Sequence, residues 1–163
     1  MIEVEEMTQK DIEKVLETIR FGHLGCSVDD VPYVVPIHYA YQKPDLYIYT
    51  TEGKKFEMIS QNPAVCLQVE DIVDGTEWKS VIITGEAEQV TDIKERERIV
   101  DLIKRSNPTL TPAISIRWMD NWIRENREVV YRIIPKSMTG RSSLKVVVKA
   151  AYAQPAFKKP KSN

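Results

Sequence analysis

Two different spacings of hydrophobic residues divide the first half of the chain. Ile12, Val15, Leu16 and Ile19 recur at i, i+3, i+4 and i+7, which places them on one side of a helix. Thr8, with an acidic side chain three residues later, is a suitable N-cap for that helix. We therefore expect the chain to open with an amphipathic helix.

After residue 20 the hydrophobic residues alternate with polar ones or form short runs rich in β-branched and aromatic side chains, which is typical of strands. The segments expected to form strands are FGHLGCSV (21–28), VPYVVPIHYAY (31–41), LYIYTT (46–51), AVCLQVE (64–70), WKSVIITGEAEQV (78–90) and REVVYRII (127–134). Asp29 and Asp30 then turn a hairpin, and Pro36, which has no N–H, is limited to an edge or a bulge. Gly85 indicates a bulge or bend, and Pro135 is expected to end the last strand.

Helical segments lie between and after these strands. The first is FEMISQNP (56–63). The second begins at Thr91 and Asp92, and its inward residues are expected to be Ile93, Ile99, Val100 and Ile103. The third is a short helix around Trp118, Trp122 and Ile123. Five or six strands with helices at the margins, and without βαβ alternation, favour a mainly β fold in the form of a small barrel.

Composition is ordinary for one globular domain. The chain has 163 residues, 42% of them hydrophobic, and a net charge of −1. The acidic start and the lack of an apolar run of 18 residues predict a cytoplasmic protein without a membrane contact. Residues 129–163 contain 8 basic and no acidic side chains, which predicts a solubilising tail or one that docks on the acidic body. No nucleic-acid-binding motif occurs, so no nucleic-acid partner is expected.

The chemistry-bearing motifs are few. Cys26 and Cys66 are too few for a disulfide framework and are expected to be free, buried thiols. His23 and Cys26 are three residues apart on an expected strand and should face opposite sides, so no metal site is predicted. Rossmann, P-loop and hydrolase-elbow motifs are missing. The informative segment is TEGKKFEM, where Gly53, Lys54 and Lys55 stand between a strand and a helix and can bind an anion.

The order of four segments is more specific than any one of them. VPYVVPIHYAY, LYIYTTEGKKFEMISQNPAVCLQVE, WKSVIITGEAEQV and EVVYRIIPKSMTGR together resemble the flavin-binding split barrels related to pyridoxamine 5′-phosphate oxidase, most closely their nitroimidazole-resistance branch. The resemblance covers residues 1–141 and implies a six-stranded split β-barrel domain there, followed by a basic extension over 142–163. It also implies that FMN lies at the interface of a homodimer.

Site residues follow from the same resemblance. It implies that Lys54 and Lys55 hold the FMN phosphate, with Thr50, Thr51 and Gly53 beside them. The strand next to the flavin ring falls on Val34, Val35, Pro36, Ile37 and His38, and the polar approach from the fifth strand falls on Ser80 with Trp78 and Lys79. His38 is the candidate catalytic residue because histidine suits proton transfer near neutral pH, with a purely structural histidine as the alternative.

These features predict an FMN-dependent oxidoreductase that reduces a small substrate, with nitroaromatic compounds as a candidate class. A nicotinamide coenzyme is one candidate donor, and donor and acceptor would use the same open ring face in turn. PYVVPIHY and KSV differ from the pattern of the vitamin B6 oxidases, which argues against that substrate. The alternatives are a haem-binding or haem-degrading protein with His23 or His38 as axial ligand, and a non-enzymatic flavin carrier or redox sensor.

Overall fold

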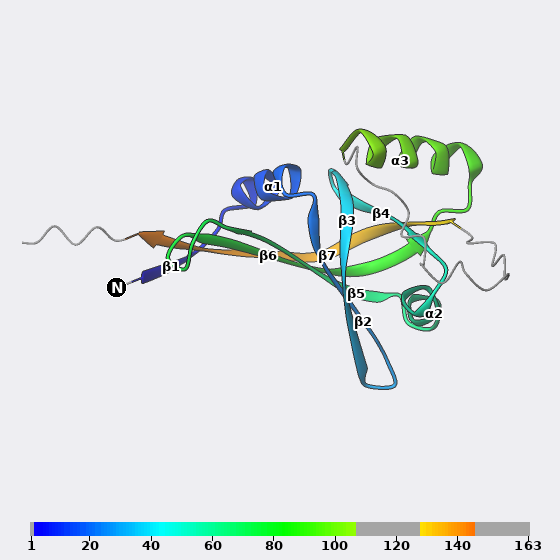
Figure 1. Cartoon of the computed structure of the whole chain (residues 1–163), viewed down its shortest axis with the longest axis horizontal. Coiled ribbons are helices and arrows are strands. Elements are labelled where there is room, and N and C mark those ends of the chain that lie inside the picture. Colours follow the sequence, from blue (N-terminus) through cyan, green and yellow to red (C-terminus); the bar gives the residue numbers. More distant parts are fainter. Residues whose placement is uncertain (1, 107–127, 146–163) are drawn as a thin grey trace, which may run out of the picture.

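The computed structural model describes residues 2–106 and 128–145, which form seven antiparallel strands and three helices (Figure 1). The strands are β1 (Ile2–Glu6), β2 (Phe21–Val28), β3 (Val31–Gln42), β4 (Asp45–Thr51), β5 (Ala64–Ile72), β6 (Trp78–Gln89) and β7 (Glu128–Lys145). The helices are α1 (Gln9–Thr18), α2 (Lys54–Gln61) and α3 (Ile93–Ser106).

The sheet closes into a ring through β7. The strand order is β1-β7-β4-β3-β2-β5-β6, and β6 pairs again with β7. All pairings are antiparallel. The expected mainly β split barrel with marginal helices is therefore confirmed, with seven strands instead of six.

The ring is split along one side of β3. That strand pairs with β2 from Val31 to His38, but with β4 only from Tyr39 to Gln42. Its first half therefore has a free edge and, with β2, forms a hairpin that projects from the ring (Figure 1). Pro36 lies on this edge strand, as expected from its missing N–H.

The hairpin turn is confirmed at Asp29 and Asp30. Both residues have positive φ, 51° and 62°, which is the backbone conformation that two-residue hairpin turns require. Aspartate tolerates it better than most residues because its short side chain can bond to nearby backbone groups.

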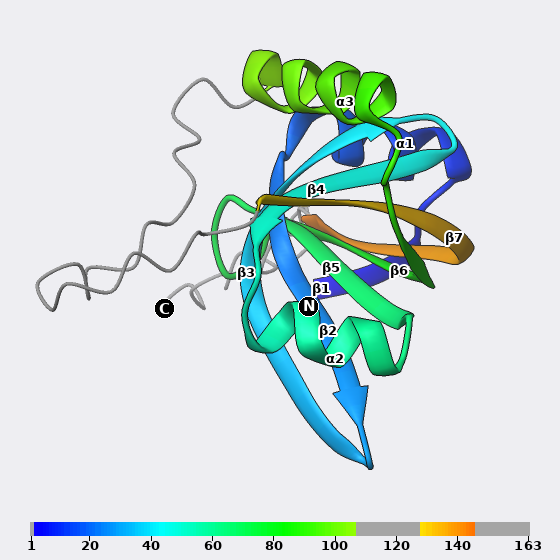
Figure 2. The same ribbon diagram turned by 90° about the vertical axis from the view of Figure 1, so that its right-hand side faces the viewer.

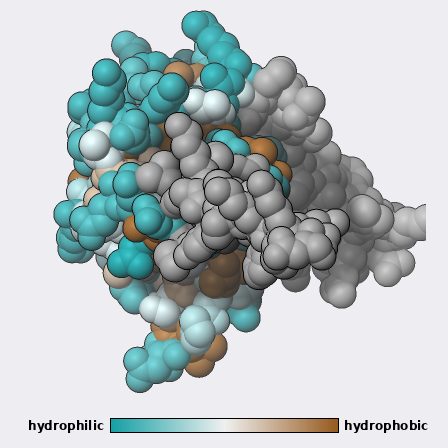
Figure 3. Space-filling model, turned by 90° about the vertical axis from the view of Figure 1, so that its left-hand side faces the viewer, coloured by the Kyte–Doolittle hydropathy of each residue, from teal (hydrophilic) through white to brown (hydrophobic). Residues whose placement is uncertain are grey.

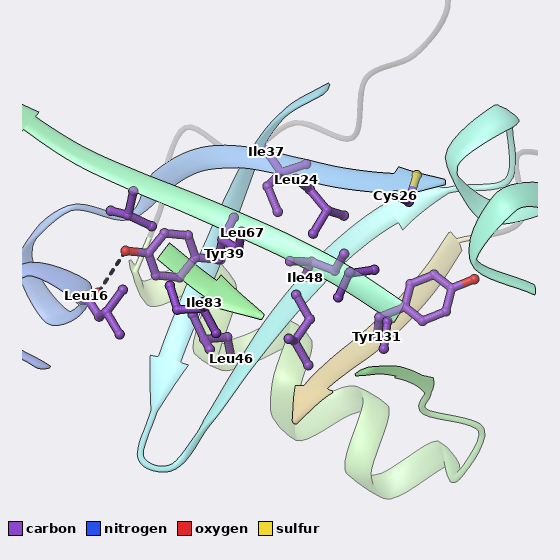
Figure 4. Close-up of a cluster of buried hydrophobic side chains, with 14 of the residues drawn as sticks. Leu16, Leu24, Cys26, Ile37, Tyr39, Leu46, Ile48, Leu67, Ile83 and Tyr131 are labelled. Atoms are coloured by element: carbon purple, nitrogen blue, oxygen red, sulfur yellow. Dashed lines mark hydrogen bonds between the residues drawn. The ribbon is translucent and has the colours of Figure 1, made fainter. Parts of the chain in front are cut away.

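Alternate residues of the strands fill the inside of the ring, and α1 closes one end of this core (Figure 4). Its hydrophobic stripe is confirmed, because Ile12, Val15 and Leu16 are buried. The hydroxyl of Tyr39 donates to the carbonyl of Leu16 at 3.2 Å and also contacts the carbonyl of Ile19. This buried phenol satisfies carbonyl groups that the helix end leaves without intrahelical partners.

A second hydrophobic cluster lies outside the ring, where α3 packs on β3 and β4 (Figure 2). Ile99 and Ile103 are buried there and Val100 is half-buried. Ile93 is 71% exposed, so the expectation that it faces inward is wrong. It is the first residue of the helix, where it lies beyond the β-surface that the next turns cover.

Three other expectations need correction. The chain does not open with α1, since β1 precedes it and pairs with the end of β7. β7 does not end at Pro135 but continues to Lys145, beyond residue 141. Cys26 is buried, but Cys66 is exposed because its side chain lies on the outer face of β5. The helix expected around residues 118–123 lies outside the described residues.

Gly85 marks the expected bulge. The register between β6 and β7 shifts between Thr84 and Gly85, and Gly85 pairs with Pro135. A Cβ at this glycine would lie 2.3 Å from the carbonyl oxygen of Ile134, which is backbone and cannot move aside cheaply.

We expect Gly85→Ala to lower the free energy of unfolding by roughly 1–3 kcal/mol, the usual cost of overpacking. Gly75→Ala is the matched control, because nothing lies within 4 Å of a Cβ at that position. Urea unfolding measures both variants. Equal stabilities would contradict the close approach of β6 and β7 at the bulge.

Candidate functional site

The N-terminus of α2 is an open cationic corner at the end of β4. Gly53 precedes the helix and accepts a hydrogen bond from the N–H of Glu57 at 3.0 Å. It has no side chain to cap the first turn, and nothing lies within 4 Å of a Cβ built on it. The first amides of the helix have no intrahelical acceptor, so this corner offers N–H groups and a positive helix end to an anion.

The two lysines of this corner differ in environment. Lys54 is exposed and its ammonium lies 4.6 Å from the ring centroid of Tyr33 on β3, a cation–π contact between α2 and the hairpin. Lys55 is half-buried, and burial lowers the pKa of its ammonium. Among the described residues, no carboxylate lies within 4 Å of Lys55. A half-buried cation without a counterion is a suitable partner for a phosphate.

Cys26 lies beneath these lysines. Burial raises the pKa of its thiol, while the nearby charges of Lys55 and Lys54 act in the opposite direction. The sulfur lies 3.8 Å from the carbonyl oxygen of Tyr33. His23, three residues earlier on β2, is on the other face of the strand, as its spacing predicted. The thiol is therefore a packing group under the corner.

The far end of α2 is also fixed to the hairpin. The side-chain amide of Asn62 donates to the carbonyl of Ser27 on β2 at 2.9 Å, and its carbonyl oxygen accepts from the N–H of Ala64 at 3.1 Å. The helix is thus attached to the β2–β3 hairpin at both ends, by Lys54 and by Asn62. This attachment holds the cationic corner in place before any ligand arrives.

A buried hydroxyl lies at the same end of the core. Tyr131 on β7 packs against Phe56 of α2, with ring centroids 6.4 Å apart. Its hydroxyl is buried and faces Ser60 without making a hydrogen bond of normal geometry. Figure 4 shows this hydroxyl and the Cys26 sulfur at the end of the cluster nearest α2. Sequence reasoning missed Tyr131 because its position on a strand predicts only packing.

Thr50 and Thr51 end β4 just before the corner. They pair with Val129 and Glu128 of β7, and both are half-buried. The hydroxyl of Thr50 lies 3.4 Å from the carbonyl oxygen of Thr51. The structure thus brings the two threonines, Gly53 and the two lysines into one continuous segment at the rim of the ring.

The strand expected beside a flavin ring presents two different faces. Val34, Pro36 and His38 are exposed on the outer face, whereas Val35 is partly buried and Ile37 is buried against the core. Only alternate members of the run can therefore contact a ligand on one face. Hydrophobic surface lies next to the hydrophilic tip of the hairpin at the bottom of Figure 3, and Val34 is 62% exposed.

Phe21, which sequence reasoning did not place in the site, adjoins His38, and His23, which it considered only as a haem ligand, adjoins Phe21. Phe21 is the direct partner of His38 on β2, and the ring centroids are 5.3 Å apart. His23, on the same face, lies 5.7 Å from Phe21. The alternation of side chains along β2 could have identified both residues, because it places residues 21 and 23 on the same face of the strand as Gly25.

Trp78, Lys79 and Ser80 lie far from the cationic corner in the same chain. They pair with Ile72, Asp71 and Glu70 at the end of β5, whereas α2 adjoins the beginning of that strand. The N–H of Trp78 donates to the hydroxyl of Ser143 at 2.9 Å, which fixes the start of β6 against β7. One chain therefore does not bring this segment to the lysines.

Within the described ranges, no three His, Cys, Asp or Glu side chains gather at metal-binding distance. No helix in this part of the chain is long and apolar enough to cross a membrane.

Comparison with known proteins supports one family. The family model described as pyridoxamine 5′-phosphate oxidase matches residues 8–142. A FAD-binding protein of Mesorhizobium loti is similar in structure, with a TM-score of 0.71 and 29% identity over 89% of this chain and 100% of the other. A candidate 5-nitroimidazole antibiotic resistance protein of Bacteroides thetaiotaomicron has a TM-score of 0.68 and 21% identity over 88% of this chain and 89% of that one.

A curated relative matches over a shorter stretch. An uncharacterized protein of Rhizobium meliloti is 33% identical over 87 residues, which span 53% of this chain and 58% of the relative. The chain thus aligns with little more than half of that protein's length.

The lowered pKa of Lys55 predicts a stability cost. Because burial disfavours the charged form, the unfolded chain binds this proton more tightly, and stability should rise with pH as the lysine loses its proton. We expect Lys55→Met to raise the free energy of unfolding at pH 7 by about 1 kcal/mol. The gain should shrink as the pH approaches 10.5, the ordinary pKa of lysine.

Lys14→Met is the control, since that side chain is exposed on α1 and its replacement should change stability little. Chemical denaturation at pH 7 and pH 10 measures both variants. A loss of stability in Lys55→Met at neutral pH would show that the ammonium has a compensating partner.

Proposed function

Because the chain belongs to the pyridoxamine 5′-phosphate oxidase family, we propose that it is an oxidoreductase that binds FMN and reduces a small substrate. The observation that carries the proposal is the half-buried ammonium of Lys55, which has no carboxylate partner among the residues that the structure describes, next to a helix N-terminus without a side-chain cap. The similar proteins of Mesorhizobium loti and Mycobacterium smegmatis, described as FAD-binding, support a flavin as the ligand.

The charge of the corner favours FMN over FAD. FMN ends in a phosphate monoester that has up to two negative charges, whereas the corresponding phosphate of FAD is joined by an anhydride bond to a second phosphate and has one. Lys54 and Lys55 together match a dianion, and the free amides of α2 add hydrogen-bond donors. Thr50 and Thr51 lie beside them as further hydroxyl donors.

His38 is the proposed proton donor. When bound, a flavin supplies two electrons to an acceptor, and a nitro group that accepts two electrons and two protons becomes a nitroso group and water. The imidazole of His38 is exposed on the outer face of β3, where a bound substrate could take a proton from it. The nearest family analogy for the acceptor is a nitroaromatic compound.

A homodimer is part of this proposal. Val34 and Ile82 are exposed on outer faces of the ring, 62% and 44%, and the hairpin projects beyond it. Trp78 and Ser80 lie at the opposite end of the sheet from the lysines, so a second copy is the way for this segment to reach the same ligand. A twofold axis would then give two equivalent flavin sites.

The proposed location is the cytoplasm. That compartment keeps Cys26 and Cys66 reduced and contains nicotinamide coenzymes, the proposed electron donors.

The lysine contacts predict a selective loss of affinity. Lys54→Ala or Lys55→Ala should each remove a charge-assisted hydrogen bond of about 1.5–3 kcal/mol, which is roughly a ten- to hundredfold loss in FMN affinity. Lys55 should give the larger effect because its charge is less exposed to solvent. Riboflavin, which has no phosphate, should bind both variants as it binds the wild type, and FAD should lose less than FMN. Fluorescence titration measures all three ligands.

Equal losses for FMN and riboflavin, or none for FMN in the double variant, would place the phosphate elsewhere. The spectrum of the purified protein tests the cofactor class itself. Flavin absorbs in the blue, whereas a Soret band would support the haem alternative. Bound FMN without any turnover of NADH, NADPH or nitroaromatic acceptors would support a carrier or sensor.

The dimer predicts a molecular mass of twice 18.8 kDa in light scattering of the FMN-bound protein. Val34→Glu should weaken the association, because like charges would then face each other across a twofold interface. Ile93→Glu, at an exposed position at the start of α3, is a charge-matched control away from Val34 and Ile82. If the protein remains a monomer when FMN is bound, the proposal of a site shared between two copies is wrong.

A further inference from the structure

Phe21 is an exposed aromatic residue between the only two histidines of the chain. It is 42% exposed at the start of β2, on the outer face of the ring. Its ring meets His38 at a centroid distance of 5.3 Å and an angle of 65°, and His23 at 5.7 Å and 78°. Both contacts are edge-to-face, so the three rings form one cluster and do not stack on one another.

The cluster combines apolar surface with hydrogen-bonding groups. Phe21 offers the face or edge of a benzene ring, and each imidazole has ring nitrogens that donate or accept. A purely apolar covering would bury these nitrogens without partners, which costs free energy. A purely polar ligand would leave Phe21 in water. The surface therefore fits a ligand that is flat and apolar at its centre and has oxygen acceptors at its rim.

The cluster continues the surface on which the proposed flavin lies. Phe21 pairs with His38, and His23 pairs with Pro36, so the cluster and the outward residues of β3 form one face. Gln68 of β5 lies across from His23 and extends this face on the other side. A substrate on the cluster would thus lie beside the proposed proton donor.

We infer that Phe21 is a specificity-determining residue on which the ring of a planar, electron-poor substrate stacks, while His23 and His38 hydrogen-bond to its oxygen atoms. Electron-poor rings are favoured because the face of a benzene ring is negative. The inference rests on the proposed function and names its substrate class as conjugated rings with nitro or carbonyl groups. Saturated acceptors of the same size should be poor ligands.

The test compares nitrobenzene with nitrocyclohexane, which have the same nitro group on a flat and on a puckered ring. Both are titrated into FMN-loaded protein and into the protein without FMN, by calorimetry and by NMR of the imidazole C–H groups. Only two histidines contribute signals, and His23→Gln assigns them. We expect nitrobenzene to shift both signals and to bind more tightly than nitrocyclohexane.

Phe21→Leu keeps an apolar side chain and removes the aromatic ring. Nitrobenzene affinity should fall roughly three- to tenfold, the range expected for an aromatic contact, whereas nitrocyclohexane affinity should change less than about twofold. FMN affinity should stay at the wild-type value. Ile93→Ala is the matched control, since Ile93 is 71% exposed at the start of α3 and lies outside both the cluster and the proposed dimer surface.

Steady-state kinetics distinguish the stacking role of Phe21 from the proton-donor role of His38. Phe21→Leu should raise KM for nitrobenzene with little change in kcat, because stacking acts on the bound substrate and the transition state alike. His38→Gln should lower kcat, because the proton donor is lost. A fall in kcat with unchanged KM in Phe21→Leu would contradict the stacking role.

Failure of this inference is distinct from failure of the proposed function. If the wild type binds no flavin, the proposed function fails, yet the imidazole signals still report whether nitrobenzene selects the cluster. Equal changes for both ligands in Phe21→Leu, or none for either, would overturn the inference. If Phe21→Leu dissociates the dimer but leaves the ratio of nitrobenzene affinity to nitrocyclohexane affinity unchanged, Phe21 is a contact between copies and the inference is wrong.

Discussion

The pairing of β7 with three other strands is the constraint on which the rest of the molecule depends. Its first residues pair with β4, its middle with β6 and its end with β1, so the sheet closes on itself. Closure gives every strand an inner and an outer face and leaves β3 with a free edge from Val31 to His38. The candidate site lies at this edge, where the unpaired part of β3 and the N-terminus of α2 are both accessible.

The cationic corner shows how this opening is held in shape. α2 is held by the buried side chains of Met58 and Ile59 and by two contacts with the hairpin, in which Asn62 binds Ser27 and Lys54 lies over Tyr33. These contacts fix the helix on the hairpin while Lys55 remains half-buried without a carboxylate in the described part of the chain. Natural proteins keep such a charge where a ligand, and not the fold, supplies its partner.

Sequence patterns predicted the elements that rest on local chemistry. The period-2 runs gave the strands, Asp29 and Asp30 the hairpin turn, and Gly85 the bulge, because each depends on residues close in the chain. β1 escaped prediction since five mostly acidic residues form a strand only when the end of β7 is present to pair with them.

The remaining misses depend on contacts between distant segments. β7 passes through Pro135 because this residue faces the bulge at Gly85, where the ladder is already irregular. The exposure of Cys66 depends on which face of β5 lies outside the ring. The pairing of Phe21 with His38, which adds a ring to the candidate site, follows from the register between two strands and not from either strand alone.

The same register also places the parts of the site along β2. Phe21, beside His38, precedes Cys26, under the lysines, by five positions along β2. At the rise of an extended strand this is a distance of about 17 Å. Val34 and Pro36 are exposed between these two levels, opposite Gly25 and His23. A small anion would occupy only the first level, and a small aromatic acceptor only the second. These two levels lie on opposite faces of β2, because Cys26 is buried inside the ring whereas Phe21 is exposed outside it. A ligand with a phosphate at one end and a flat ring at the other, such as the proposed flavin nucleotide, would therefore have to pass around the free edge of β3 to contact both.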